Sequence, residues 1–470
     1  MKEYDVIVIG AGEGKGIAFR AAEKGLKTAI IDKGTYKDYI GGTCLTVGCI
    51  PTKMLAYPAD VVVETERAER LGIDLKIKKI DFTGIMERMR AYRKKIIDYV
   101  KDALKNTENL DFYMAETHFT GEYTLNVNGE ELRGKKIFIA TGSRPSIPPL
   151  KGLNEIDYLT NESALELTEM PKSLIILGGG YVAVEFAHFF AAMGTKVTLI
   201  EVIDRLAAFE EPEIAELLKE ELSKRMDIFL GTEALEFKKK GKRYSVKLRD
   251  KKSGREWEIT AEKVMVATGR KSNADLLKPE NTGVELDEKK YIKINEYLET
   301  SKENIWCIGD ATGKQMFTHA ADKEAKIAWH NANIMNNNLN KQKMDFFAVP
   351  HAIYSYPQIA SIGLTEAEAK KDHDILVGKA KYSDTGRGAA MMEEKGFAKA
   401  VVEKDSRKIL GFHIIGPEAP VLLQEVANVV AERGAVEDIT EKMHTFPSLP
   451  DLVVEVLSRL EPVTAPAMVS

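Results

Sequence analysis

The sequence predicts an α/β fold in which two similar parallel-sheet units are followed by an α+β domain near the C-terminus. A short apolar run, a glycine-rich turn and a helical stretch open the chain, and the same order of segments returns from residue 174. Strand-like runs that end in the triplet Ala-Thr-Gly also occur twice, at residues 137–142 and 264–269. Beyond about residue 346, alternating strands and amphipathic helices are typical of an α+β domain.

The first unit begins with a strand predicted at residues 5–9, an apolar run of the kind that is buried in a parallel sheet. A glycine turn at residues 10–16 and a helix at residues 17–24 follow. A second strand is predicted at residues 28–32, and it ends in Asp32. This order forms a βαβ unit, and the terminal acid is typical of a Rossmann-like dinucleotide-binding domain.

In such a unit the glycines let the backbone turn tightly and approach a pyrophosphate, which the helix N-terminus stabilises. Gly10 and Gly12 occupy these positions, and Asp32 is placed to accept hydrogen bonds from an adenosine ribose. The expected third glycine is replaced by Lys15, directly after Gly14, so we expect a loop one residue shorter than usual. A glycine turn that binds no ligand is the alternative interpretation.

The second unit repeats the pattern with strands predicted at residues 174–177 and 196–201 and a helix at 184–192. Its second strand ends in Glu201, and a carboxylate there favours the 2′-hydroxyl of NAD and repels the 2′-phosphate of NADP. We therefore expect NAD, with NADP as the less favoured alternative because Arg205 lies nearby. The three small positions of the turn are Gly178, Gly180 and Ala183.

The two Ala-Thr-Gly segments indicate that the second unit is inserted into the first. The first unit would resume through the apolar run that ends in Gly309-Asp310, and residues 62–106 are predicted as a long helical excursion within it. In the C-terminal domain we expect strands at residues 398–402 and 409–415, together with helices at 420–433 and 451–459. The predicted domains are residues 1–149 with 275–345, residues 150–274, and residues 346–470.

Composition excludes several classes of protein. The formal net charge is −5, so there is no basic excess to attract nucleic acid or anionic lipid. Three cysteines in 470 residues cannot form the disulfide framework of a small secreted protein. Neither a signal peptide nor an apolar run of about 18 residues is present. We therefore expect a cytoplasmic protein with no membrane partner.

Residues 41–53 read GGTCLTVGCIPTK, and Cys44 and Cys49 in this segment can sit one helical turn apart and close a disulfide. In a cytoplasmic protein such a pair is more often catalytic or metal-binding than structural. Zinc needs four ligands, and the only other cysteine, Cys307, lies in a distant apolar run. Redox chemistry is the favoured interpretation, with a zinc site and inert core thiols as alternatives.

Together these motifs resemble those of the class I pyridine nucleotide-disulfide oxidoreductases. This family of FAD enzymes includes dihydrolipoamide dehydrogenase, glutathione reductase, mycothione reductase and mercuric reductase. The resemblance covers nearly the whole chain. It is carried by both glycine turns, the GGTCLTVGCIPTK segment, both Ala-Thr-Gly triplets, Gly309-Asp310 and the segment YSYPQIA at residues 354–360.

The resemblance implies that FAD lies on the first glycine turn and NAD(H) on the second. Cys49 would be the charge-transfer thiolate against the flavin, and Cys44 the interchange thiol that attacks the substrate. Lys53 would pair with Glu185 near the flavin, and Tyr181 would cover the nicotinamide pocket; a solvated lysine and a merely packing tyrosine are the alternatives. The implied cofactor-binding positions are Gly10, Gly12, Gly14, Asp32, Lys33, Gly42, Thr43, Lys53, Thr141, Gly142, Gly309, Asp310, Gly178, Gly180, Tyr181, Glu201 and Gly269.

The sequence departs from the family near its C-terminus. Disulfide reductases of this family carry a His-Pro pair there, followed by a carboxylate, and this acid–base dyad reaches the active site of the other subunit of a homodimer. Here Pro447 and Asp451 are in place, but the histidine position is Phe446, which cannot transfer a proton. His444, two residues earlier, is the candidate replacement, so His444 and Asp451 complete the predicted catalytic set.

The resulting prediction is an FAD-dependent, NAD(H)-linked oxidoreductase similar to dihydrolipoamide dehydrogenase, acting on a thiol or disulfide and forming a homodimer. The alternative is a metal-ion reductase of the mercuric type, because those enzymes have Phe-Pro at this position and reduce a metal thiolate without delivering a proton. Against it, no cysteine follows Cys307 and no N-terminal metal-binding module is present. A flavin-bound redox sensor is a third hypothesis.

Overall fold

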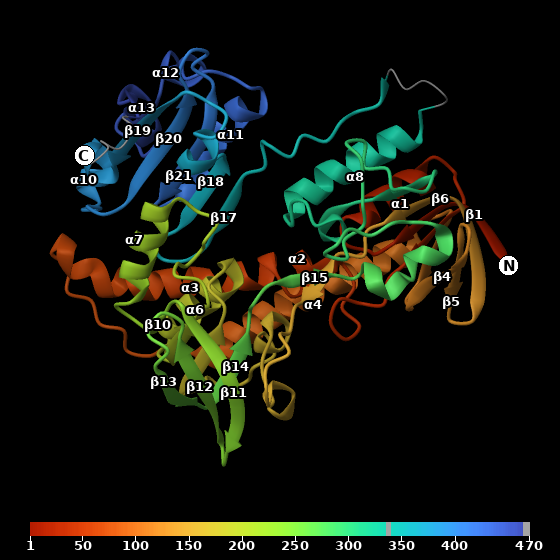
Figure 1. Cartoon of the computed structure of the whole chain (residues 1–470), viewed down its shortest axis with the longest axis horizontal. Coiled ribbons are helices and arrows are strands. Elements are labelled where there is room, and N and C mark those ends of the chain that lie inside the picture. Colours follow the sequence, from red (N-terminus) through yellow and green to blue (C-terminus); the bar gives the residue numbers. More distant parts are fainter. Residues whose placement is uncertain (335–339, 464–470) are drawn as a thin grey trace.

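The computed structural model describes residues 1–334 and 340–463, and it confirms the predicted α/β class, with two Rossmann-like units and a C-terminal α+β region. Figure 1 shows the first sheet at the right, the second unit at the bottom, left of centre, and the C-terminal sheet at the upper left. The exact limits of the three domains stay a prediction. No helix within the described residues is both long and apolar enough to cross a bilayer.

The first sheet has seven strands in the order β3-β2-β1-β6-β5-β4, with β16 paired to β6 outside this path. Strands β3, β2, β1, β6 and β16 run parallel. Because β16 comes after the whole second unit in sequence, the chain returns to this sheet late. Its strands are β1 (Lys2–Ile9), β2 (Thr28–Ile31), β3 (Leu110–Tyr113), β4 (Thr117–Gly121), β5 (Thr124–Val127), β6 (Glu130–Ile139) and β16 (Ile305–Cys307).

Both faces of β1 are buried, which explains its unbroken apolar run. Val6 and Val8 pack into the core that α1 (Gly14–Glu23) and α8 (Thr318–Ala332) cover. Ile7, between them, belongs to a separate core on the other face. Alternation along a strand therefore fixes both layers of the first unit.

Two long helices follow β2 and its loop: α3 (Cys49–Arg67) and α4 (Phe82–Asn106). In Figure 1, α4 lies at the centre, between the first sheet and the second unit, and α3 runs to the left, above the second unit and below the C-terminal region. The prediction of one long helical segment over residues 62–106 is wrong for the stretch between α3 and α4, which is not continuously helical. The chain turns at Gly72, where φ is +79°, and α4 begins only after Asp81, whose side chain accepts the N–H of Gly84 at 3.2 Å.

The second unit contains a parallel sheet in the order β10-β9-β8-β14 and an antiparallel sheet in the order β11-β12-β13. Short strands β7 and β15, which follow β6 and β14, pair with each other. The elements are β7 (Ser143–Pro145), α5 (Asn161–Ala164), β8 (Ser173–Leu177), α6 (Tyr181–Met193), β9 (Lys196–Ile200), α7 (Pro212–Leu222), β10 (Asp227–Phe229), β11 (Thr232–Lys240), β12 (Arg243–Asp250), β13 (Glu256–Ala261), β14 (Lys263–Val266) and β15 (Arg270–Ser272).

The C-terminal region holds a six-stranded antiparallel sheet in the order β17-β18-β21-β20-β19-β22. The strands and helices predicted there form within one or two residues of their expected limits. The elements are β17 (His351–Ile353), β18 (Ile359–Gly363), α9 (Glu366–Ala369), β19 (Ile375–Lys381), α10 (Gly386–Ala390), β20 (Phe397–Glu403), β21 (Ile409–Ile415), α11 (Ala419–Ala431), α12 (Glu437–Thr440), α13 (Asp451–Ser458) and β22 (Glu461–Pro462).

Candidate active site

A cavity of about 650 Å³ lies where the first glycine turn, α2 (Gly42–Thr46), α3 and α8 come together. Most of the predicted site residues line it. They are Gly10, Gly12, Asp32, Lys33, Gly42, Thr43, Cys44, Cys49, Lys53, Thr141, Gly142, Tyr181, Glu185, Gly309 and Asp310. Seven other predicted residues, all within the described part of the chain, lie outside this lining: Gly14, Gly178, Gly180, Glu201, Gly269, His444 and Asp451.

The first glycine turn passes very close to the end of β6. Gly10 has a φ of +108°, and a Cβ atom there would lie 2.2 Å from the carbonyl oxygen of Ala140. A Cβ atom on Gly14 would lie 2.8 Å from Cγ1 of Val8. Gly14, the first residue of α1, therefore takes the place of the third glycine, whereas Lys15 donates a hydrogen bond to a backbone carbonyl of the turn at 2.8 Å. This agrees with the shortened loop expected from the sequence.

Asp32 ties the glycine turn to the loop that follows β2. One carboxylate oxygen accepts the N–H of Ala11 at 2.6 Å, and the other accepts the N–H of Gly34 at 2.6 Å. Burial raises the pKa of Asp32, and the two backbone hydrogen bonds oppose that rise. The carboxylate is thus fixed in the cavity wall as an acceptor suited to a ribose hydroxyl.

A second acid in the wall, Asp310, is held by two residues that sequence reasoning missed. Ser143 donates its hydroxyl to Asp310, and Arg270 Nε donates to Ser143 Oγ at 2.7 Å. Arg270 Nε also lies 3.6 Å from an Asp310 oxygen. Ser143 and Arg270 each directly follow an Ala-Thr-Gly triplet, and this shared position is the signal that could have found them.

The lining fits a dinucleotide such as FAD. Backbone approaches backbone at the first turn, since a Cβ atom on Gly42 would lie 2.6 Å from Cα of Gly12. Thr141 Oγ1 is buried in the wall without a hydrogen-bond partner among the residues that the structure describes. Backbone N–H groups at a helix N-terminus can bind a pyrophosphate, and the unpaired hydroxyl of Thr141 can hydrogen-bond to a polar ring or a sugar.

The two cysteines lie in two successive helices. Cys44 is within α2, and Cys49 is the first residue of α3. Both are free thiols. Cys49 Sγ lies 3.7 Å from Oγ1 of Thr318, which is the first residue of α8. Two helix N-termini, each favourable to negative charge, therefore meet at this sulfur.

The pKa values of the two thiols move apart. Hydrogen bonds from Cys44 and Thr318 and the positive charge of Lys53 lower the pKa of Cys49 to about 6. Partial desolvation of the thiol in the cavity opposes this, although the residue is exposed at the protein surface. The hydrogen bond to Cys49, together with burial, raises the pKa of Cys44. At neutral pH the pair therefore carries one negative charge, and Cys49 holds it.

Lys53 joins the cysteine helix to the second unit. Its Nζ lies 2.8 Å from both carboxylate oxygens of Glu185, which is on α6 and only 6% exposed. Glu185 also accepts the N–H of Tyr354 at 3.0 Å, and Nζ of Lys53 lies 4.6 Å from the centre of the Tyr354 ring. The predicted Lys53–Glu185 pair thus forms, and it holds a cation within reach of Cys49.

The second glycine turn repeats the backbone contact of the first. Gly178 has a φ of +114°, and a Cβ atom there would lie 2.3 Å from the carbonyl oxygen of Ala267, at the end of β14. Gly180 is the N-cap of α6. Gly269, two residues beyond Ala267, has a φ of +122°. These predicted residues lie together in the second unit, apart from the cavity wall.

Glu201 follows β9 next to this turn. Its Oε1 accepts the N–H of Ile203 at 2.9 Å, and a Cβ atom on Gly179 would come within 2.8 Å of its Oε2. Arg205, the nearby base, donates to the backbone carbonyl of Ala208 at 2.8 Å. The negative charge of Glu201 therefore lies at the glycine turn, whereas the guanidinium of Arg205 is hydrogen-bonded to the carbonyl of Ala208.

Tyr181 connects the second glycine turn to the cavity. It is the first residue of α6 and lines the cavity wall. Its ring packs against Phe209 and Phe317, with centroids 6.5 Å away in each case. Burial raises the pKa of its hydroxyl.

The C-terminal candidates each have a different partner. His444 Nε2 lies 2.6 Å from an oxygen of Glu425, and Asp451 accepts the N–H of Ser448 at 3.0 Å. Phe446 is 80% exposed. The structure therefore pairs His444 with Glu425, and neither His444 nor Asp451 lines the cavity of the same chain, so their catalytic role stays a prediction.

Comparison with known proteins agrees with this geometry. Residues 4–325 match the sequence profile of the family described as pyridine nucleotide-disulphide oxidoreductase, and residues 349–457 match the profile of its dimerisation domain. The chain is 34% identical to a mycothione reductase of Mycobacterium tuberculosis, over 97% of this chain and 99% of the relative.

Other relatives carry different names. The chain is 33% identical to a dihydrolipoyl dehydrogenase of Bacillus subtilis, over 96% of this chain and 97% of the relative. It is also 33% identical to a mercuric reductase of Staphylococcus aureus, over 94% of this chain and 80% of the relative. Among solved structures, the Cu(II) complex of the HOCl-induced flavoprotein disulfide reductase RclA from Escherichia coli aligns with a TM-score of 0.86 and 26% identity, over 97% of this chain and 99% of that one.

Proposed function

The chain belongs to the pyridine nucleotide-disulphide oxidoreductase family, and from this premise we propose that Cys44 and Cys49 are its redox centre, linking NADH to a thiol or disulfide substrate. The observation that carries the proposal is the contact of Cys49 with Thr318 and its lowered pKa, in the same cavity as the first glycine turn. FAD, when bound, supplies the group that accepts a hydride from the nucleotide and exchanges electrons with the cysteine pair.

The residues of the first turn would hold that cofactor. The backbone at Gly10 and Gly12 and the N-terminus of α1 would bind the pyrophosphate, Asp32 would bind the adenosine ribose, and Asp310 would bind the ribityl chain. The remaining predicted positions that line the cavity are Lys33, Gly42, Thr43, Thr141, Gly142 and Gly309. Lys53, fixed by Glu185, keeps a positive charge beside the reacting atoms.

In the reducing direction the pair works by two thiolate attacks. Cys44 gives up its proton to solvent as it attacks one sulfur of the substrate disulfide, which releases one substrate thiolate. Cys49, already a thiolate, then attacks Cys44, closing the Cys44–Cys49 disulfide and releasing the second thiolate. The protein disulfide is reduced again by the two electrons of one NADH, and the released thiolates take up protons. Dihydrolipoamide oxidation is the same sequence reversed.

We infer NAD in preference to NADP. Glu201 lies at the second glycine turn, where it accepts a ribose 2′-hydroxyl and repels a 2′-phosphate. The glycines of the turn, Gly178, Gly180 and Gly269, would carry the nucleotide, and Tyr181 would cover its nicotinamide. The dimerisation domain at residues 349–457 supports a homodimer, in which the C-terminal segment with His444 and Asp451 approaches the cavity of the partner subunit.

A metal-ion reductase is the second candidate, and Phe446 favours it. Reduction of a thiolate-bound metal ion releases its ligands as thiolates and needs no proton delivered to a leaving thiol, so no proton donor is required at that position. One relative is named mercuric reductase, and the similar solved structure is a Cu(II) complex. The electron path to Cys44 and Cys49 is the same in both candidates.

The test is NADH oxidation by the purified flavoprotein with lipoamide, and separately with Hg(II) in excess thiol. Fast turnover with lipoamide supports the disulfide substrate, whereas turnover with Hg(II) alone supports the metal ion. Cys44→Ser and Cys49→Ser should each abolish turnover while the flavin stays bound. Cys307→Ala, at a buried thiol that does not itself line the cavity, is the matched control. Full disulfide reductase activity in either active-site variant would remove the proposed redox centre.

A further inference from the structure

The cavity wall at Tyr181 is part of a closed circuit of four rings: Tyr181, Phe317, His351 and Phe209. Phe317 stacks on His351, with centroids 5.6 Å apart and ring planes within 10° of each other. Phe209 meets both His351 and Tyr181 edge to face, at 5.6 and 6.5 Å. Tyr181 closes the circuit against Phe317 at 6.5 Å. Each ring therefore limits the movement of two others.

The imidazole is the one member of the circuit that is fixed by a charge. His351 Nε2 lies 2.8 Å from Oε1 of Glu210, whose side chain is completely buried. The hydroxyl of Ser361 donates to the other oxygen of Glu210 at 2.5 Å. Since both carboxylate oxygens are engaged, Glu210 holds the imidazole in one orientation.

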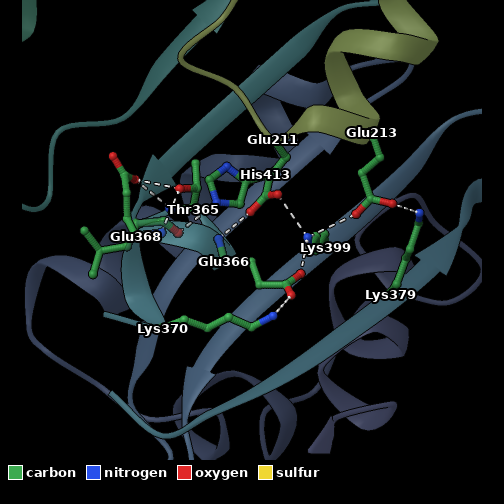
Figure 2. Close-up of polar contacts among 10 residues, drawn as sticks. Glu211, Glu213, Thr365, Glu366, Glu368, Lys370, Lys379, Lys399 and His413 are labelled. Atoms are coloured by element: carbon green, nitrogen blue, oxygen red, sulfur yellow. Dashed lines mark hydrogen bonds and ion pairs between the residues drawn. The ribbon is translucent and has the colours of Figure 1, made fainter. Parts of the chain in front are cut away.

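The next residue, Glu211, anchors the same segment a second time. Figure 2 shows Lys399 of β20 surrounded by Glu211, Glu213 and Glu366. The Nζ of Lys399 lies 3.0 Å from Glu211 and 2.7 Å from Glu366, and the Lys399 side chain is only 5% exposed. The backbone N–H of Glu366 also donates to Glu211 at 2.6 Å. Two successive buried acids therefore fix the segment that carries Phe209 onto the C-terminal sheet.

Resting on the proposed function, we propose that His351, held by Glu210, is a positioning residue that keeps Tyr181 closed over the nicotinamide side of the cavity. Phe209 and Phe317 transmit the constraint, because both touch His351 and Tyr181. Phe209 is 47% exposed, so the circuit has one open side toward which Tyr181 can swing when a nucleotide enters. Loosening the Glu210–His351 pair should make entry easier without changing the transfer of the hydride.

The test is the rate of flavin reduction by NADH, followed without oxygen or disulfide substrate over a range of NADH concentrations. In Glu210→Gln, which keeps the shape of the carboxylate, and in His351→Phe, which keeps the ring, we expect the half-saturating NADH concentration to fall at least threefold. The limiting rate should change less than twofold. A structural defect alone would lower flavin content and thermal stability. It would not lower the half-saturating NADH concentration while leaving the limiting rate nearly unchanged.

Two further variants sharpen the test. Glu403→Gln breaks another His–Glu contact of the same length, His373–Glu403 at 2.8 Å, on the same sheet, and should behave like the unmodified protein. Phe209→Leu opens the circuit without disturbing a buried charge, so it serves if the Glu210 or His351 variants fail to fold. If the half-saturating NADH concentration is unchanged in Phe209→Leu and in those Glu210 and His351 variants that fold, this inference is overturned and the proposed function is not. An unmodified flavoprotein that NADH does not reduce overturns the proposed function, and this inference with it.

Discussion

The sulfur of Cys49 lies 3.7 Å from the hydroxyl of Thr318, although 269 positions separate the two residues in the chain. Each of them is the first residue of a helix, so both helices present their amino ends to one sulfur atom. After the hydrogen bond from Cys44, which has the largest effect, this contact helps to lower the pKa of Cys49.

Thr318→Val should raise the pKa of Cys49. A hydrogen bond to a charged group is worth about 1.5 kcal/mol, which corresponds to roughly one pH unit. Because the pKa of this thiol is lowered to about 6, its thiolate forms as the pH rises through that value. The alkylation rate of the reduced protein by iodoacetamide should therefore have its midpoint near pH 6, and the variant should shift it upward. Thr65→Val, on the exposed part of α3, is the control, and an equal midpoint in both variants would contradict the role of Thr318.

Lys53→Met should destabilise the protein by about 2 kcal/mol, because it leaves the carboxylate of Glu185 buried with only a backbone donor. The value lies below that of a fully buried pair, since a third of the Lys53 side chain is exposed. Urea unfolding measures the change. Lys135→Met removes an exposed pair with Asp5 and should cost less than about 0.5 kcal/mol. Adding Glu185→Gln to Lys53→Met should recover part of the loss, and no recovery would mean that packing of the lysine stem causes it.

Glu201→Ala should weaken the preference for NADH over NADPH about tenfold, since it removes the charge that repels a 2′-phosphate. The measurement is the ratio of kcat/KM for the two nucleotides. Glu233→Ala removes an exposed acid that pairs with Arg249 and should leave the ratio unchanged. If the ratio stays the same in Glu201→Ala as well, another group selects the nucleotide.

Phe446→His should raise lipoamide turnover at least tenfold if proton transfer limits it, because general acid–base catalysis contributes roughly a hundredfold or more. Turnover with Hg(II) should stay the same. Met443→His introduces an imidazole at a fully exposed position three residues earlier and should have no such effect. A variant that gains nothing with lipoamide would show that the shape of the pocket, and not the missing proton donor, sets the substrate.

Sequence reasoning reached the parts of the site whose signals are local. The spacing of the glycines alone indicated the tight turn at Gly10. The structure adds the physical reason, because the carbonyl of Ala140 leaves no room for a side chain there. Cys44 and Cys49 stood out because they are neighbours in the chain. The resemblance to known enzymes supplied the Lys53–Glu185 pair, which bridges two helices that no local pattern connects.

The contacts that remained hidden are those between chemically ordinary residues far apart in sequence. Thr318 follows a phenylalanine at the end of a loop, and the packing of α8 against α1 brings it to Cys49. His444 was proposed as the replacement for the missing histidine, but nothing in the sequence pointed to its contact with Glu425 of α11. The same reason applies to Glu210 and His351, which become neighbours only when the C-terminal sheet packs against the second unit.

The paired contacts of Gly10 with Ala140 and of Gly178 with Ala267 bear on how this chain arose. In each unit the glycine after the first strand lies against the alanine that begins the matching Ala-Thr-Gly triplet. A Cβ atom on either glycine would lie at nearly the same distance from that alanine's carbonyl oxygen. An internal gene duplication leaves such a correspondence, because a descendant inherits the constraint together with the residue. The two units differ at the last small position of the turn, which is Gly14 in the first and Ala183 in the second. An ancestral unit reconstructed from both halves should therefore fold around the same glycine.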